Sequence, residues 1–171
     1  EKKVDLFLGH EKASLPLRTT PLFLTAAADA ARLAWNPFCS PNLAAYLPRL
    51  FRAPADAREA KTAPPRPTVG VVLKGCDARS VVTLIQEHQI PREQVVILGL
   101  CCSGMVDVER LVPAGGSLAG IAISTGTDGR LTVESDGDRR TLAVGEILQE
   151  RCRVCEYTRP PVADEILGDP A

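Results

Sequence analysis

The chain has 171 residues, of which 45% are hydrophobic and only 4% aromatic, and its 20 basic and 21 acidic residues give a net charge of −1. This composition predicts one domain, or a large domain with a small appendage, with a mainly aliphatic core. The interspersed charges argue against a nucleic-acid footprint or a basic membrane-binding face, and no run approaches the roughly 20 apolar residues of a membrane span.

The first 52 residues predict an N-terminal α/β lobe. Thr25 is a candidate N-cap for a helix, and Ser40-Pro41 predicts the start of a second one because proline suits the first helical position. Two strands and two helices are expected here, at residues 4–8, 21–24, 25–33 and 42–50. Residues 53–67 hold four of the 14 prolines. They predict a surface connection or hinge to a second lobe, residues 68–171.

The centre of the chain gives the clearest prediction. Val69–Leu73 is a continuous apolar run, as expected for a strand buried on both faces. Asp77 is a candidate cap for a helix running to about His88, and residues 95–98 predict the next buried strand. The two strands of such a β-α-β unit are parallel, so both end at one edge of the sheet. Ligands of open α/β sheets bind at that edge.

A different pattern follows Gly115-Gly116. Asp128-Gly129 and Asp136-Gly137 are hairpin signals that separate three short runs, residues 120–124, 130–134 and 140–144. They predict an antiparallel ribbon inserted at about residues 117–144. A helix over about residues 145–150 is expected to return the chain to the sheet. The predicted fold is therefore α/β: a small, mostly parallel sheet with flanking helices and an inserted antiparallel β-ribbon.

Five of the six cysteines occupy positions suited to a buried metal centre. Cys76 follows the first central strand, Cys101 and Cys102 follow the second, and Cys152 and Cys155 form a late C-x-x-C. Iron–sulfur clusters and structural zinc sites both use about four thiolates. The residues alone favour an iron–sulfur site, and they leave open zinc, thiol redox chemistry or core packing, and, as a lesser alternative, disulfides.

The surroundings of Cys76 add further candidates. A cysteine at the start of a helix benefits from the exposed amides and the positive end of the dipole, which favour a thiolate. Lys74, Asp77 and Arg79 could contact an anionic cofactor there, although a cap with solvated charges is nearly as good an interpretation. Gly75 lets the backbone come close to a bulky group. Cys39, before the Ser40-Pro41 helix start, is an alternative ligand or reactive thiol.

Three of these motifs resemble those of the beta subunits of coenzyme-F420-reducing hydrogenases and the related formate dehydrogenases. That family carries Gly-Thr-Pro-Cys after one strand, Gly-Leu-x-Cys-x-Gly after the next, and a late C-x-x-C followed by Ala-Asp and Gly-Asp. The matching stretches here are Leu73-Lys74-Gly75-Cys76, which keeps only the cysteine of the first motif, Gly99–Gly104, Cys152–Cys155, Ala163-Asp164 and Gly168-Asp169. The chain is also similar to short ferredoxin-associated proteins of anaerobes that accompany heterodisulfide-reductase-like subunits.

The resemblance covers roughly residues 69–169 and implies one 4Fe–4S cluster. It selects Cys102 over Cys101, and the implied ligands are Cys76, Cys102, Cys152 and Cys155, with Cys101 and Cys39 as alternates. In the hydrogenase subunits a flavin lies beside the cluster, so FAD is a second cofactor to test. Its candidate contacts, or supports behind the ligands, are Lys74, Gly75, Asp77 and Arg79.

The function predicted from the sequence is that of a cytoplasmic iron–sulfur electron-transfer subunit, or domain, of a larger anaerobic redox complex. Its expected partners are ferredoxin-like, heterodisulfide-reductase-like, hydrogenase or dehydrogenase subunits, with no nucleic acid and no membrane span. One alternative is a flavin-dependent oxidoreductase subunit that passes electrons between a soluble hydride carrier and the cluster. A second alternative is a zinc-stabilised structural module.

Overall fold

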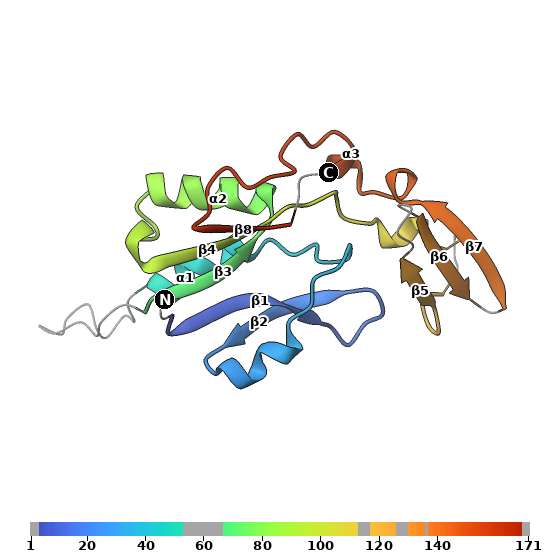
Figure 1. The fold of residues 1–171 in the computed structure, drawn as a ribbon, viewed down its shortest axis with the longest axis horizontal. Coiled ribbons are helices and arrows are strands. Elements are labelled where there is room, and N and C mark those ends of the chain that lie inside the picture. The colour runs from blue at the N-terminus through green and yellow to red at the C-terminus, as the bar shows by residue number, and fades with distance from the viewer. Residues whose placement is uncertain (1–3, 53–66, 113–116, 126–129, 136, 169–171) are drawn as a thin grey trace, which may run out of the picture.

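The computed structural model of the protein describes residues 4–52, 67–112, 117–125, 130–135 and 137–168 (Figure 1). Eight strands form two separate sheets in this part of the chain. The larger sheet has the order β2-β1-β3-β4-β8, with β1 Leu6–Lys12, β2 Thr19–Leu24, β3 Val69–Leu73, β4 Val95–Leu100 and β8 Glu165–Leu167. Only the β1–β2 pair is antiparallel. The predicted α/β class with a mostly parallel sheet is confirmed.

The β-α-β unit is built as the sequence predicts. β3 and β4 are parallel, in a register that pairs Val69 with Val95, and α2, Gly75–Gln86, connects them. Four of the five β3 residues are buried, as the unbroken apolar run requires. The main core packs these strands and β1 against α2 and α1, Leu47–Phe51. Both central strands therefore deliver the chain to the same carboxyl edge of the sheet.

The predicted ribbon is present as the second sheet, with the order β5-β6-β7 and antiparallel pairing. Its strands are β5 Ala122–Thr125, β6 Arg130–Ser135 and β7 Asp138–Ala143. Figure 1 shows this sheet at one end of the molecule, and Leu131 and Val133 carry its buried face onto a second core cluster with Phe38 and Val106. The turns at Asp128-Gly129 and Asp136 lie outside the described residues.

The N-terminal strands join the central sheet, because β1 pairs with β3 in parallel. Most of the predicted connection at residues 53–67 lies outside the described residues, and the division into two lobes stays a prediction. The predicted helix at 25–33 is wrong: Ala27–Arg32 is a 3-10 helix with no buried residue. Alanines without an apolar stripe gain too little from packing to stabilise an α-helix.

Three further helix predictions need correction. Asn42, not Ser40, caps the next segment by accepting a hydrogen bond from the Ala44 amide, and the chain forms a 3-10 turn, Leu43–Tyr46, before α1. Lys74, not Asp77, stands at the N-cap of α2. The expected helix at 145–150 is replaced by a 3-10 turn, Val144–Glu146, and by the short α3, Glu150–Arg153, which contains the first cysteine of the C-x-x-C.

Two shorter 3-10 turns, Arg92–Gln94 and Val108–Arg110, complete the described helical segments. None of the described helices is long and apolar enough to cross a membrane.

Candidate metal centre

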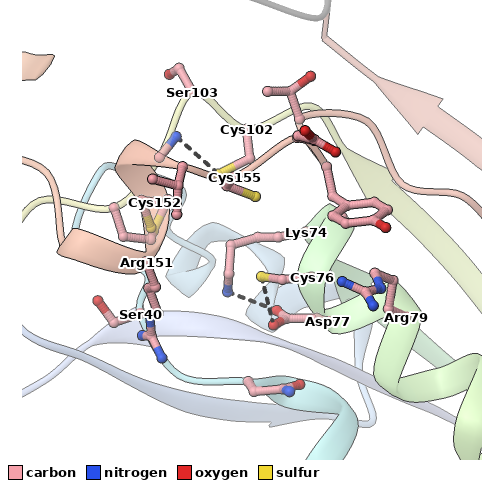
Figure 2. A pocket seen from close by; sticks show the side chains of 18 of the residues that line it. Ser40, Lys74, Cys76, Asp77, Arg79, Cys102, Ser103, Arg151, Cys152 and Cys155 are labelled. Atoms are coloured by element: carbon pink, nitrogen blue, oxygen red, sulfur yellow. Dashed lines mark hydrogen bonds and ion pairs between the residues drawn. The ribbon is translucent and has the colours of Figure 1, made fainter.

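A cavity of about 510 Å³ opens at the carboxyl edge of β3 and β4, and all four predicted ligands line it (Figure 2). Cys76 comes from the first turn of α2, Cys102 from the loop after β4, and Cys152 and Cys155 from α3 and the turn that follows. Segments separated by up to 79 positions in sequence, from 76 to 155, thus meet around one space. All six cysteines of the chain are free thiols, so no disulfide competes for them.

Main-chain hydrogen bonds hold the C-terminal segment against β4. The Cys102 amide donates to the Thr158 carbonyl at 2.8 Å, and the Cys101 amide donates to the Leu167 carbonyl at 3.0 Å. The Asp164 carboxylate accepts from the Ile97 amide at 2.8 Å. It also forms an ion pair with Arg92, at 3.0 Å. The Ala163-Asp164 motif therefore anchors the strand β8 that the sequence reasoning missed, and this anchor fixes the C-x-x-C beside the other cysteines.

Gly75 brings the C-x-x-C loop close to the start of α2. A Cβ atom at this position would overlap the carbonyl oxygen of Tyr157 and would lie 2.9 Å from its carbonyl carbon. Backbone atoms cannot rotate away as a flexible side chain can, so only glycine permits this approach. The sequence predicted that Gly75 lets the backbone approach a bulky bound group, whereas the close contact in the structure is with the chain's own C-terminal loop.

The environment of the thiols favours a bound cation over four free thiolates. Cys76 is exposed as a residue, but loss of hydration around its thiol and the neighbouring Asp77 carboxylate raise the pKa of Cys76 to about 11. The Cys76 thiol donates to Asp77 Oδ1 at 3.5 Å. Burial also raises the pKa of Cys102, and charges on Cys152 and Cys155 raise it further. Such mutual repulsion between thiolates is removed when a positively charged inorganic core binds them.

Two groups oppose this trend and favour a thiolate. The Gly104 amide donates to Cys102 Sγ at 3.4 Å, and the Lys74 ammonium lowers the pKa of both Cys76 and Cys102. A sulfur that already accepts an amide hydrogen bond is prepared for ligation. The donor set, four thiols with amide and ammonium support, therefore fits a soft metal centre.

The structure describes a cavity shared by four cysteines, not a closed coordination site. Among the residues that the structure describes, no group of three or more His, Cys, Asp or Glu side chains is placed to hold one metal ion. Structural zinc sites and four-iron clusters both use about four thiolates. The chemistry of the four cysteines therefore suits either centre.

The other predicted contacts also line the cavity, and two of them are already engaged. Lys74 and Asp77 are 3% and 2% exposed and form an ion pair of 2.7 Å between Nζ and Oδ2. Lys74 Nζ also donates to the carbonyls of Cys39 and Pro41, at 2.9 and 3.1 Å. Its three protons therefore have partners within the chain. Arg79 stacks over the ring of Tyr157, 4.1 Å from its centroid.

The two alternate ligands lie outside this cavity. Cys39 is fully buried, burial raises its pKa, and its thiol donates to the Ala34 carbonyl at 3.6 Å. Cys101 does not line the cavity, whereas Cys102 does. The sequence reasoning also missed Arg151 and Tyr157, which line the mouth. The only feature of the sequence that could have indicated these two residues is their position beside the C-x-x-C motif.

Comparison with known proteins finds a similar fold in a solved structure. No family model matches the chain. A chain of the F420-reducing [NiFe] hydrogenase complex from Methanosarcina barkeri has a similar structure, with a TM-score of 0.59 and 18% sequence identity. The match covers 89% of this chain and 53% of the other, so this chain spans about half the length of its structural neighbour. At this identity the likeness shows a shared fold.

Proposed function

We propose that this chain is an iron–sulfur electron-transfer subunit or domain of a larger redox complex, and that it holds one 4Fe–4S cluster. The observation that carries the proposal is the meeting of four cysteines around one cavity at the carboxyl edge of the sheet. The ligands would be Cys76, Cys102, Cys152 and Cys155. The structural neighbour from a hydrogenase complex supports a redox setting, and its partners suggest other redox subunits for this chain.

When bound, the cluster would supply reversible one-electron chemistry at this edge. The chain's own residues provide the rest. Cys76 and Cys155 are exposed and form the open side of the site, whereas Cys102 and Cys152 are partly buried. The Gly104 amide and the Lys74 ammonium place positive charge near the sulfurs, which favours the reduced, more negative state. Electrons would thus enter and leave at the exposed side.

A flavin-dependent oxidoreductase subunit is the second candidate. The cavity extends past the cysteines to a polar wall that includes Ser40, Asn42 and Arg151, and this wall could contact an anionic cofactor. The buried Lys74–Asp77 pair does not support that role, because each charge is neutralised by the other. Flavin analysis separates the two proposals, since only the second requires stoichiometric FAD.

The test is an absorption spectrum of anaerobically purified protein, with iron, sulfide, zinc and flavin measured on the same sample. We expect about four irons per chain and a broad band near roughly 400 nm that dithionite bleaches. Stoichiometric flavin in addition would shift the proposal to the oxidoreductase. A colourless protein with one zinc per chain would overturn it and would establish a structural module.

A further inference from the structure

The cysteine cavity is lined by an unusual combination of exposed side chains, Arg79, Arg151, Val154 and Tyr157. The exposed Arg153 of α3 stands between Cys152 and Val154 in sequence, and we call these five residues the basic rim. Val154 is 80% exposed and Tyr157 40% exposed, although both are apolar enough to favour burial. Val154 stands between the two cysteines of the C-x-x-C, directly before the exposed Cys155. Figure 2 shows Arg79 and Arg151 on opposite sides of Cys76. Among the large apolar side chains of the described residues, the most exposed one thus lies next to an exposed thiol of the proposed site.

The positive charges of the basic rim are not neutralised by ion pairs among the described residues. None of its three arginines forms an ion pair with a described residue. Arg79 is held over the Tyr157 ring, and Arg151 donates to the Gln149 side-chain oxygen at 3.0 Å. These contacts fix the arginines without neutralising them.

The segment that carries the C-x-x-C is positive on a chain that is slightly negative. Residues 150–159 together with Arg79 contain four arginines and two glutamates, a local net charge of +2, whereas the whole chain carries −1. A positive patch on such a chain favours a partner with a negative face.

We propose that the basic rim is the docking surface for a small acidic electron-carrier protein, which brings its own redox centre to the exposed side of the cysteine site. This inference rests on the proposed function. Tyr and Arg are enriched among the residues that dominate binding, and an apolar centre with a charged border is the usual anatomy of an interface. The patch is small, as expected for transient redox encounters.

The exchange moves one electron and nothing else. The carrier is oxidised by one electron as the site is reduced, or the reverse, and no bond forms or breaks. A bound cluster with four thiolates adds negative charge inside the cavity. The rim arginines are exposed, so they come nearer to a docked partner than a group inside the cavity does, and Coulomb attraction weakens with distance and with salt. The arginines therefore determine that an approaching partner meets positive charge.

The experiment is isothermal titration of the purified chain with an acidic two-cluster ferredoxin and, separately, with the basic protein cytochrome c. We expect the ferredoxin to bind at low ionic strength and its Kd to rise on the order of tenfold at 0.3 M salt. Arg153→Glu should raise that Kd by a similar factor. The matched control is Arg139→Glu on β7, which makes the same charge change on an arginine with a 72% exposed side chain. It should change Kd less than twofold.

Two outcomes would overturn the docking surface: no ferredoxin binding at low salt, or equal weakening by Arg153→Glu and Arg139→Glu. Preferential binding of cytochrome c would do the same. Titration reports binding whether or not iron is present. An iron-free chain that still binds the ferredoxin through Arg153 would contradict the proposed function and support this docking surface. An iron-loaded chain that does not bind the ferredoxin would support the proposed function and contradict the docking surface. We expect the NMR chemical shifts of the Val154 and Tyr157 amides to change when the ferredoxin binds, which would locate the partner on the basic rim.

Discussion

Replacing Gly75 by alanine should dismantle the proposed site with a single methyl group. The new Cβ would overlap the Tyr157 carbonyl oxygen, and neither partner is a flexible side-chain end. Gly75 begins α2, so alanine on its own would stabilise the helix by up to about 1 kcal/mol. The clash lowers stability and the better helix propensity raises it. A net loss of stability in Gly75→Ala would therefore indicate that the contact with the Tyr157 carbonyl is present.

The clash should win. Forcing an extra carbon into a packed contact costs roughly 1–3 kcal/mol. The loop that must move also carries the Thr158 carbonyl, which accepts from the Cys102 amide at 2.8 Å, and losing that bond costs about 1 kcal/mol more. After the gain in helix propensity, the net loss of stability is roughly 1–3 kcal/mol. The same movement carries Cys155 away from Cys76, so iron content should fall with stability.

The assay is urea denaturation of the metal-free variant together with iron content after anaerobic reconstitution. Gly145→Ala is the control, because a Cβ at Gly145 meets nothing within 4 Å and its backbone does not require glycine. That variant should keep wild-type stability and iron. If Gly75→Ala matched Gly145→Ala in both measurements, the close approach of the C-x-x-C loop to α2 would be refuted.

Three other predictions use the same denaturation and loading assays. Lys74→Met should destabilise the chain by about 3–5 kcal/mol because it leaves the buried Asp77 carboxylate unpaired, and adding Asp77→Asn should recover most of the loss. Burial, assisted by Lys74, lowers the pKa of buried His10 to about 4. The unfolded chain then binds a proton that the folded chain does not, so stability should fall by roughly 3 kcal/mol as pH falls from about 6.5 to 4, and His10→Leu should remove this dependence. Cys155→Ser should lower the melting temperature of the loaded protein but leave the metal-free protein nearly unchanged, because the thiol is exposed; equal losses in both forms would contradict its role as a ligand.

The sequence could predict the parts of the fold that rest on local patterns. The apolar run of β3 and the strand after α2 predicted a parallel pair, and parallel pairing alone was enough to expect Cys76 and the Cys101/Cys102 pair at one edge. The choice of Cys102, which lines the cavity, came from the family resemblance. The antiparallel ribbon followed from its hairpin signals. These features depend on residues close in sequence, so a single sequence is enough to predict them.

The features that were missed depend on contacts between distant segments. β8 has three residues, only one of them partly buried, and it is held by the Asp164 carboxylate that reaches Ile97. The buried Lys74–Asp77 pair reads as an ordinary exposed helix start until the Cys39–Pro41 segment covers it. No local pattern reports a partner more than 30 positions away, so neither could be predicted from the sequence.

The most direct test of the cysteine centre uses two adjacent residues. Cys102 lines the cavity and Cys101 does not, although the two are adjacent in the loop after β4. Iron and sulfide per chain should be measured after anaerobic reconstitution of Cys102→Ser and Cys101→Ser. The account predicts loss or marked depletion of the cluster in the first variant and about four irons per chain in the second. Full loading of Cys102→Ser would contradict the proposed centre.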